Sequence, residues 1–167
     1  MQLKNCGDAL QFVNVLKTEE ICLEAVKNCE NSFSYVPNEL KTEEICLAAV
    51  QQNGFALRYV PNKLKTNEMC LVAIKKDGLA LQFTSNTLIT EEMCLVAIKK
   101  DGLALQFVNV KTEEICLAAV QQNGYALKFV NVITKEMCLI AVKKNGWALQ
   151  FVPNELKKKI RSILRIR

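Results

Sequence analysis

Apolar and polar positions recur along most of this chain with a period of 22 to 24 residues. Residues 41–64, KTEEICLAAVQQNGFALRYVPNKL, show the pattern well. A threonine and two glutamates lead into a block of apolar residues, which is followed by an Asn-Gly pair and a second apolar block. A fixed period of this length is typical of solenoid proteins, in which each repeat packs against the next.

Aligning the copies divides the chain into one partial repeat and six full repeats. Residues 1–16 form a half-repeat that holds only the second half of the pattern. The full repeats are 17–40, 41–64, 65–88, 89–110, 111–132 and 133–156. The shorter copies lose residues at one point, where a VPNKL connector becomes VNV, and this point therefore marks a loop. The pattern predicts one repeat domain over residues 1–156, followed by a basic tail or capping helix at 157–167.

The first half of each repeat predicts one helix, which begins with a polar first turn and is buried over the rest of its length. Thr42 is a favourable N-cap, and Glu43 and Glu44 lie in the first turn, where carboxylates complement the helix dipole. Residues 45–50, ICLAAV, are apolar nearly all the way round a helix. Such a helix must be covered on more than one side, and neighbouring repeats would provide that cover.

The second half of each repeat predicts a short second helix. We expect Gly54, and likewise Gly78 and Gly102, to end the first helix as a left-handed C-cap with positive φ. Four apolar residues then have the spacing of a helix of about two turns, which Pro61 ends: Ala56, Leu57, Tyr59 and Val60. A strand is less favoured because FALRYV does not alternate apolar and polar residues. The sequence therefore predicts an all-α solenoid of tandem 22–24-residue helix-turn-helix repeats, in preference to a mixed α/β repeat.

The repeat at residues 17–40 departs most from the pattern. Glu24 stands where later repeats have an apolar residue. Glu30 replaces the glycine that follows the first helix, and Ser32 replaces an alanine. Terminal repeats of a solenoid need a polar outer face, so we interpret this repeat as an N-terminal cap.

The motif A-V-x-x-N-G-x-A-L, at 49–57 and again at 119–127, resembles the repeat family known as domain of unknown function 4116. The similarity extends from Cys6 to about Leu156. The family pattern usually has an aliphatic residue where this chain has Cys46, Cys70 and Cys94. The resemblance implies tandem helical pairs, and it implies no activity, because the family offers no catalytic residues to carry over.

The positive charge of the chain is concentrated at its C-terminal end. The net charge is +5, but residues 157–167 contain six basic residues and no acidic ones, and the rest is close to neutral. Ile160, Ile163 and Leu164 have helical spacing within this tail. The tail is thus either a capping helix with a solvated basic face or an anion-binding segment for nucleic acid or acidic lipid. The candidate anion-binding residues are Lys157, Lys158, Lys159, Arg161, Arg165 and Arg167.

Six of the eight cysteines occupy one position of the repeat: Cys22, Cys46, Cys70, Cys94, Cys116 and Cys138. A metal or disulfide ladder is disfavoured because equivalent positions on stacked helices lie roughly 8–10 Å apart, too far to share a zinc ion or a disulfide. We expect these cysteines to be small, buried, reduced apolar side chains. Cys6 and Cys29 occupy the position of Asn53 and are expected to be more exposed.

The chain offers little for catalysis. It has no histidine, which is the commonest general base. Its paired glutamates recur at helix starts, where the helix dipole accounts for them, and its glycines are single and periodic rather than clustered in a phosphate loop. We therefore expect no enzyme activity, metal or cofactor.

The residue after the repeat glycine varies in size and polarity from copy to copy, while its neighbours barely change. We expect this position to be partly exposed, and we expect the position that is always Phe or Tyr, as at Tyr59 and Phe83, to belong to the core. The variable residues that form the candidate binding ridge are Phe55, Leu79, Leu103, Tyr125 and Trp147. Exposed apolar ridges often mark binding sites. The alternative is that these side chains only cover the loop of the next repeat.

The sequence thus favours a non-enzymatic scaffold for protein–protein interaction, with nucleic acid or an acidic membrane as the alternative partner through the tail. The apolar blocks are far too short to span a bilayer. The opening residues, MQLKNCGDAL, show no secretory signal, so a cytoplasmic protein is expected. The identity of the partner, the oligomeric state and whether the chain is part of a longer array stay open.

Overall fold

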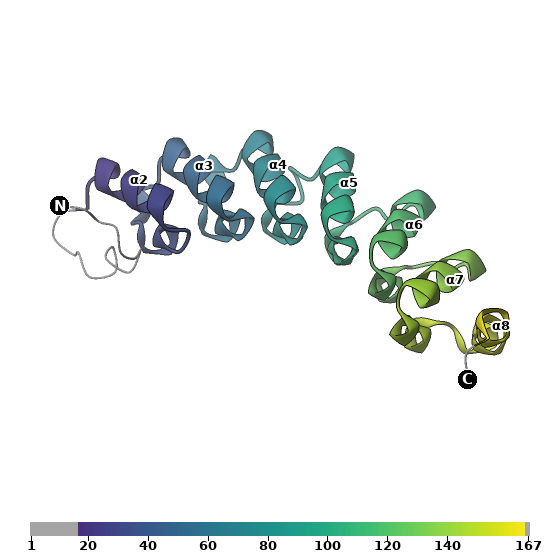
Figure 1. The fold of residues 1–167 in the computed structure, drawn as a ribbon. Coiled ribbons are helices and arrows are strands. Elements are labelled where there is room, and N and C mark those ends of the chain that lie inside the picture. Colours follow the sequence, from purple (N-terminus) through teal and green to yellow (C-terminus); the bar gives the residue numbers. More distant parts are fainter. Residues whose placement is uncertain (1–16, 166–167) are drawn as a thin grey trace. The chain divides into compact units, whose positions relative to one another are not determined.

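The computed structural model describes residues 17–165, which form α-helices and 3₁₀-helices (η) without any strand (Figure 1). Six ten-residue α-helices lead the repeats: α2 (Glu19–Asn28), α3 (Glu43–Gln52), α4 (Asn67–Lys76), α5 (Glu91–Lys100), α6 (Glu113–Gln122) and α7 (Lys135–Lys144). Each is followed by a 3₁₀-helix: η1 (Ser32–Tyr35), η3 (Gly54–Tyr59), η5 (Gly78–Phe83), η6 (Gly102–Phe107), η7 (Gly124–Phe129) and η8 (Gly146–Phe151). Two connectors contain the short turns η2 (Asn38–Leu40) and η4 (Asn62–Leu64), and the last helix is α8 (Asn154–Leu164). The predicted all-α solenoid is confirmed.

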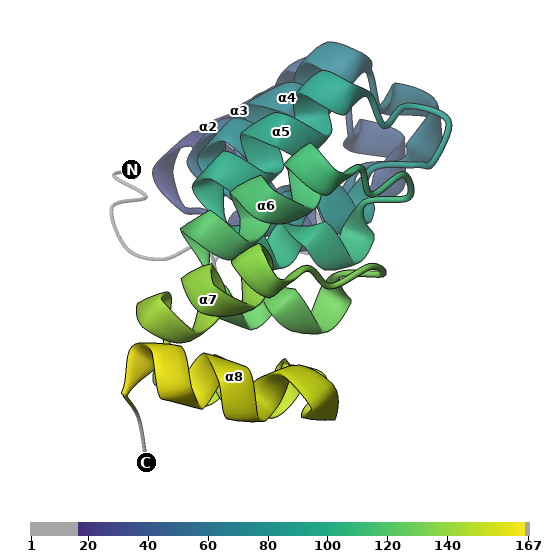
Figure 2. The ribbon, with the colours of Figure 1, turned by 90° about the vertical axis from the view of Figure 1, so that its right-hand side faces the viewer.

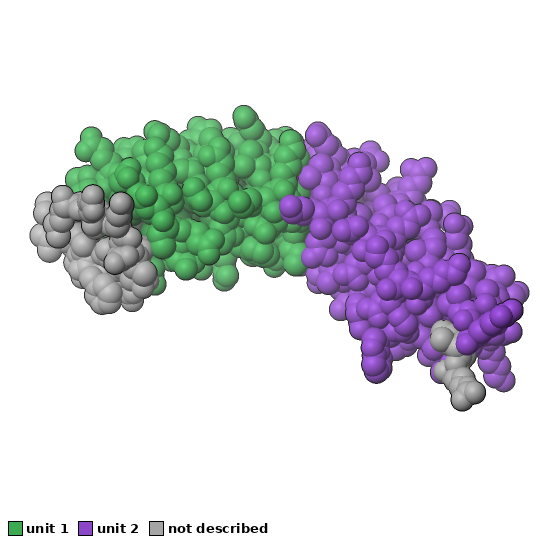
Figure 3. All heavy atoms as spheres, viewed as in Figure 1, with its two compact units in different colours: residues 1–89 green, residues 90–167 purple. Residues whose placement is uncertain are grey.

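The chain divides into two compact units, Met1–Ile89 and Thr90–Arg167 (Figure 3). In the first unit α2, α3 and α4 pack in chain order, and η1, η3 and η5 form a second row. In the second unit α5 to α8 form one row, as Figure 2 shows for α6, α7 and α8, and η6, η7 and η8 form the other. Three 3₁₀-helices also pack against the α-helix of the following repeat, η3 on α4, η6 on α6 and η7 on α7, so these apolar α-helices are covered on more than one side.

The predicted helix starts are confirmed. The Thr42 side chain accepts a hydrogen bond from the backbone N–H of Ile45, which lies within the first turn of α3. The same cap recurs at the other five α-helices that lead repeats: Thr18, Thr66, Thr90, Thr112 and Thr134. The cap satisfies one of the N–H groups that have no partner inside the helix.

The predicted left-handed C-cap is wrong. Helix α3 ends at Asn53, which is extended with φ −143° and ψ 115°. Gly54 is instead the first residue of η3, and no glycine in the described part of the chain has positive φ, Gly78 and Gly102 included. The chain turns at the asparagine because its side chain accepts a hydrogen bond from the N–H of Phe55 at 2.8 Å, which caps the second helix as it starts.

The repeat glycine has a packing role rather than a conformational one. Gly54 is buried, and a Cβ built on it would overlap the backbone carbonyl oxygen of Ala73 in α4. The same close approach brings Gly102 to the carbonyl of Ala119 and Gly124 to that of Ala141. Glycine is required here because only a residue without a Cβ lets two backbones come this near.

The core consists mainly of aliphatic residues, methionine and cysteine, with Phe33 as the one buried aromatic residue within residues 17–165, and the aromatic position at the ends of the 3₁₀-helices does not belong to it. Ile45, Cys46, Ala49 and Val50 of α3 are buried, as are the alanine and leucine of each full 3₁₀-helix up to η7. The rings at the ends of the 3₁₀-helices are half-buried, and Tyr59 is 42% exposed. The prediction of an aromatic core position is therefore wrong. The backbone becomes extended directly after each ring, and the residue that follows the ring is buried in the core. These buried residues are Val36, Val60, Thr84, Val108, Val130 and Val152.

A lysine before the capping threonine ties the two ends of a repeat together. Lys41 Nζ donates to the carbonyl oxygen of Tyr59 at 3.0 Å, and Lys65 Nζ donates to that of Phe83 at 2.7 Å. Lys17 and Lys111 make the equivalent bonds to Tyr35 and Phe129. A cation at the last carbonyls of a helix is favourable. Sequence reasoning missed this contact, although the recurrence of lysine directly before the threonine was visible.

Candidate functional site

The candidate ridge lies at the starts of the 3₁₀-helices. Phe55, Leu79, Leu103 and Tyr125 are half-buried, and Trp147 is 77% exposed. In four of the five, the backbone N–H donates a hydrogen bond of 2.8 to 3.0 Å to the side-chain oxygen of the residue two positions earlier. The pairs are Phe55 with Asn53, Leu103 with Asp101, Tyr125 with Asn123 and Trp147 with Asn145. These side-chain caps fix the point from which each ridge side chain projects.

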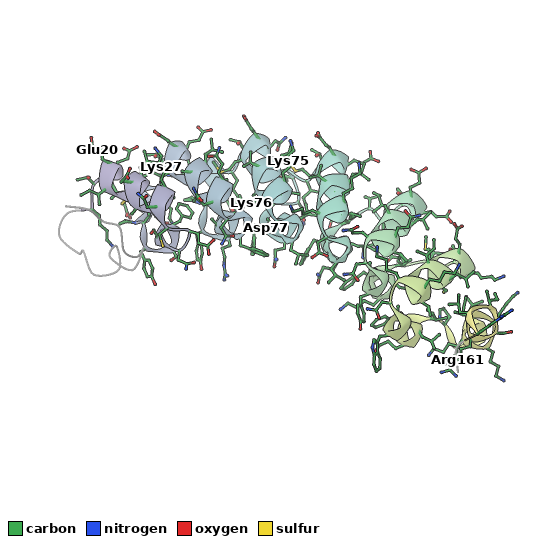
Figure 4. The ribbon with its side chains drawn as sticks, viewed as in Figure 1. Glu20, Lys27, Lys75, Lys76, Asp77 and Arg161 are labelled. Atoms are coloured by element: carbon green, nitrogen blue, oxygen red, sulfur yellow. The ribbon has the colours of Figure 1, made fainter. Side chains whose placement is uncertain are left out.

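Leu79 is the exception, because the aspartate two positions before it accepts a hydrogen bond from the neighbouring repeat instead. Asp77 Oδ2 accepts a hydrogen bond from the N–H of Gly54 at 2.8 Å, which links α4 to the start of η3. Figure 4 shows Asp77 at the end of α4, next to Lys75 and Lys76. The carboxylate therefore has a structural partner in the neighbouring repeat.

Ridge residues pack on the aromatic ring of the following repeat. The rings of Phe55 and Phe83 meet edge-to-face, with centroids 6.1 Å apart and planes at 73°. Tyr125 and Phe151 repeat the contact at 6.1 Å and 70°. Such pairs contribute roughly 0.5–1.5 kcal/mol beyond the area they bury. Phe55 and Tyr125 thus each cover part of the next repeat while staying partly open to solvent.

Cations stack on the aromatic rings that end three of the 3₁₀-helices. The Arg58 guanidinium lies 5.0 Å from the centroid of Tyr59 and 5.9 Å from that of Phe83. In the second unit Lys128 Nζ lies 4.5 Å from the centroid of Phe129. Cation–π contacts of this kind stabilise the rings, all three of which stay partly exposed.

Trp147 differs from the other ridge residues because it lies on η8, the last 3₁₀-helix of the row within residues 17–165. Gly146 is exposed, and a Cβ built on it would meet no atom within 4 Å. Helix α8 follows, and it packs against α7. A large aromatic side chain is thereby left open to solvent on a backbone that Asn145 fixes.

A hollow of about 180 Å³ lies between η1 and η3 in the first unit, and sequence reasoning missed it. Its aromatic walls are Phe33, Phe55 and Tyr59, and its edge is polar. The polar residues that line it are Glu30, Asn31, Ser34, Asn53 and Arg58. The signal in the sequence was Asn31, a small polar residue at the position where later repeats have Phe, Leu, Tyr or Trp.

The basic tail forms most of α8, which starts at Asn154, before the predicted boundary at 157. Ile160 is fully buried and Leu164 is half-buried, whereas Ile163 is 46% exposed. Figure 4 shows Arg161 on this helix. Among the candidate anion-binding residues, Lys158, Lys159, Arg161 and Arg165 are exposed and Lys157 is half-buried. Arg167 lies outside the described residues.

Comparison with known families accounts for the repeats. A family model described as "Domain of unknown function (DUF4116)" matches residues 3–41, 42–89, 90–133 and 134–160. The chain belongs to the DUF4116 family. Three of the four matched segments begin at a capping threonine, namely Thr42, Thr90 and Thr134. The two middle segments each contain two repeats as defined above, so one DUF4116 unit corresponds here to two pairs of an α-helix and a 3₁₀-helix. No curated protein and no solved structure matches the chain.

The cysteines of this DUF4116 chain are packing residues. All six at the repeated position are buried with free thiols, as predicted. Burial raises the pKa of each thiol, and it raises that of Cys46 to about 11. A thiol held protonated is a poor nucleophile and a poor metal ligand. Cys29 is half-buried rather than exposed, and Cys6 lies outside the described residues.

The described residues contain neither a cluster that could bind a metal nor a helix that could cross a membrane. Within residues 17–165, no three histidine, cysteine, aspartate or glutamate side chains are grouped so that they could hold a metal ion. None of the helices in that range is both long and apolar enough to cross a bilayer. The ridge, the hollow and the exposed face of α8 are therefore the surfaces with chemistry to consider.

Proposed function

We propose that this chain is a non-enzymatic scaffold that binds another protein through its ridge residues, which are Phe55 and Leu79 in the first unit and Leu103, Tyr125 and Trp147 in the second. The observation that carries the proposal is Trp147, which is 77% exposed although its backbone is held by the Asn145 cap. Exposed tryptophans in fixed positions are frequent hot spots of protein interfaces, because they bury a large area at little cost in conformational entropy.

The chemistry of the remaining residues supports a binding role over an enzymatic one. Histidine is absent from the chain, the buried thiols are held protonated, and Asp77 is engaged with Gly54. We place the scaffold in the cytoplasm. The free thiols at the repeated cysteine position suit a reducing compartment.

The test begins with capture of the partner from the native host on immobilised full chain, followed by mass spectrometry. The affinity of the identified partner is then measured for wild type and for Trp147→Ala. We expect the substitution to weaken binding by about 2 kcal/mol, roughly 30-fold, with helical content unchanged.

Val132→Ala is the matched control, because Val132 is 78% exposed, is apolar and lies in the same unit but outside the ridge. It should leave the affinity unchanged. Equal affinities of wild type and Trp147→Ala would contradict the proposal. An equal loss of affinity in Trp147→Ala and Val132→Ala would also contradict it, because the effect would then not be specific to the ridge.

A second candidate function is anion binding through α8. Its support is the group of exposed cations at Lys158, Lys159 and Arg161. Because Ile160 is buried, the apolar side of α8 is already used inside the fold, which favours electrostatic attraction over insertion into lipid.

The charges are best removed without disturbing that packing, by changing Lys158, Lys159 and Arg161 together to Gln. If α8 binds anions, wild type should bind duplex DNA or phosphatidylserine vesicles at 50 mM salt, and the triple variant should lose most of that binding. Binding that is equal in the two proteins, or that does not weaken with salt, would exclude α8 as the site.

A further inference from the structure

The contact between a ridge residue and the aromatic ring of the following repeat is a recurring unit of this fold. It is made by Phe55 on Phe83 and by Tyr125 on Phe151, with the same centroid separation of 6.1 Å in both units. In one repeat of each unit, the ring at the end of a 3₁₀-helix thus receives a second ring edge-to-face, whereas Leu79 and Leu103 occupy the ridge position in the repeats between them.

At the start of the described row this contact lacks one of its two rings. Asn31 occupies the ridge position and Tyr59 occupies the aromatic position of the following repeat. Both line the hollow of about 180 Å³, and Tyr59 is 42% exposed. The hollow therefore lies against the face of the repeat that receives a ring elsewhere in the chain.

The size of the hollow suits a single side chain. A cavity of about 150 Å³ is large enough to bind benzene, whereas pockets for drug-sized ligands start near 300 Å³. One six-membered ring with its methylene group matches the space of about 180 Å³ between η1 and η3.

The chemistry of the walls favours an aromatic occupant over an aliphatic one. All three aromatic residues line the hollow: Phe55 and Tyr59 have partly exposed rings, and Phe33 is only 1% exposed. The Arg58 guanidinium lies 5.0 Å from the centroid of Tyr59. An incoming ring can stack on the cation while it meets the tyrosine edge-to-face. The polar side chains at the edge suit the peptide groups on either side of such a residue, because buried peptide groups need hydrogen-bond partners.

We propose that the hollow between η1 and η3 is a binding site for one aromatic side chain, phenylalanine or tyrosine, of a partner polypeptide. This inference rests on the proposed scaffold function and adds the chemistry of the ligand. The partner residue completes from outside the ring contact that Phe55 and Tyr125 make from within the chain.

The test uses 4-methylphenol and toluene, the side-chain analogues of tyrosine and phenylalanine, as probes. Backbone amide shifts of Phe55, Arg58 and Tyr59 are followed by NMR during titration of the full chain. We expect saturable shifts at these amides at millimolar concentrations. Shifts that do not saturate, or that spread equally over the rest of the chain, would overturn the proposal.

Two variants of Asn31 distinguish the effect of filling the hollow from the effect of simply losing the asparagine side chain. Asn31→Phe supplies the missing ring from within, as Phe55 does for Phe83, and should weaken probe binding at least tenfold. Asn31→Ala leaves the hollow open and should bind the probes as wild type does. Undiminished binding by the Phe variant would show that the probes lie elsewhere.

Arg58→Gln gives an independent measurement should the Phe variant fold poorly. Glutamine stands at this repeat position in Gln82, Gln106 and Gln150, so the fold accepts it. Loss of the cation should weaken 4-methylphenol binding about threefold. Unchanged probe binding by Arg58→Gln would contradict the proposed stacking.

The captured partner distinguishes this inference from the scaffold proposal. Reduced affinity of Asn31→Phe or Arg58→Gln for the partner supports the hollow as a partner site. If these variants bind the partner normally while Trp147→Ala does not, the hollow is excluded and the scaffold stands. If Trp147→Ala binds normally, the ridge proposal fails whatever the probes do.

Discussion

Alanine at the repeat glycine should have opposite effects in neighbouring repeats. A Cβ on Gly124 would lie 2.5 Å from the carbonyl oxygen of Ala141 and 3.2 Å from its carbonyl carbon. A Cβ on Gly146 would meet nothing within 4 Å. The two glycines occupy the same position of the repeat and the same unit of the chain, so Gly124→Ala and Gly146→Ala differ chiefly in this contact.

The magnitudes follow from two opposing effects. Replacing glycine by alanine at an unstrained position stabilises the fold by about 0.4–1 kcal/mol, because the unfolded chain loses conformational freedom. Gly146→Ala should gain this much. In Gly124→Ala the new methyl group would force α7 away from η7, and overpacking of this kind costs about 1–3 kcal/mol. The net loss should be about 0.5–2 kcal/mol, since the backbone carbonyl cannot move aside as a flexible side chain can.

Urea unfolding followed by circular dichroism provides the measurement. The midpoint should fall for Gly124→Ala and rise for Gly146→Ala, with similar slopes in both, because the surface exposed on unfolding hardly changes. Gly54→Ala repeats the experiment in the first unit, where the carbonyl of Ala73 is the obstacle. Equal effects of Gly124→Ala and Gly146→Ala would refute the close-approach explanation.

Two further predictions concern buried polar atoms and buried thiols. Ser32 is fully buried and its hydroxyl has no hydrogen-bond partner within the described residues, so Ser32→Ala should raise the free energy of unfolding by about 1–2 kcal/mol in urea titrations. The exposed control Ser34→Ala should change it by less than about 0.5 kcal/mol, and an equal change in both would contradict the argument. Burial raises the pKa of Cys46 to about 11, above the value of about 8.5 in an unfolded chain, so the stability it contributes is present below about pH 8.5 and is lost as the pH rises toward 11. The stability advantage of wild type over Cys46→Ala should therefore shrink by about 1–3 kcal/mol between pH 8 and pH 11, and a constant difference would show that the thiolate is not disfavoured in the fold.

The helices could be predicted from sequence because their signals are local. The threonine cap, the acidic first turn and the apolar block specify α3 without reference to any other part of the chain. The same holds for the cysteines, whose position within an apolar block implied burial. Local pattern and tertiary packing agree at these positions, so one sequence suffices.

The glycine and the aromatic ring were predicted incorrectly because their roles depend on a neighbouring repeat. An Asn-Gly pair after a helix has the composition of a left-handed C-cap, and the contact of Gly54 with Ala73 is between residues far apart in the chain. An invariant ring such as Phe83 resembles a core residue, yet it is the receiving surface for Phe55. Repetition alone does not distinguish a residue that is buried from one that recurs because it contacts the next repeat.

The candidate hollow was missed for a related reason. The sequence shows Asn31 as a polar residue at the ridge position. Its small side chain leaves a hollow only if the ring opposite it, that of Tyr59, keeps the position that it would have against a larger ridge residue. The position of Tyr59, its stacking with Arg58 and the shape of the space between η1 and η3 follow from packing across two repeats.

The side-chain caps at the starts of the 3₁₀-helices separate the position of a ridge residue from its identity. Asn123 and Asn145 hold the backbone of the residue two places on, whether that residue is tyrosine or tryptophan. Substitutions at the four capped ridge positions can therefore accumulate without a change of backbone, and each of these repeats contributes one variable position to the surface. A lineage, or a designed library, can alter the binding preference of such a chain one residue at a time, while the helices that display those residues stay the same.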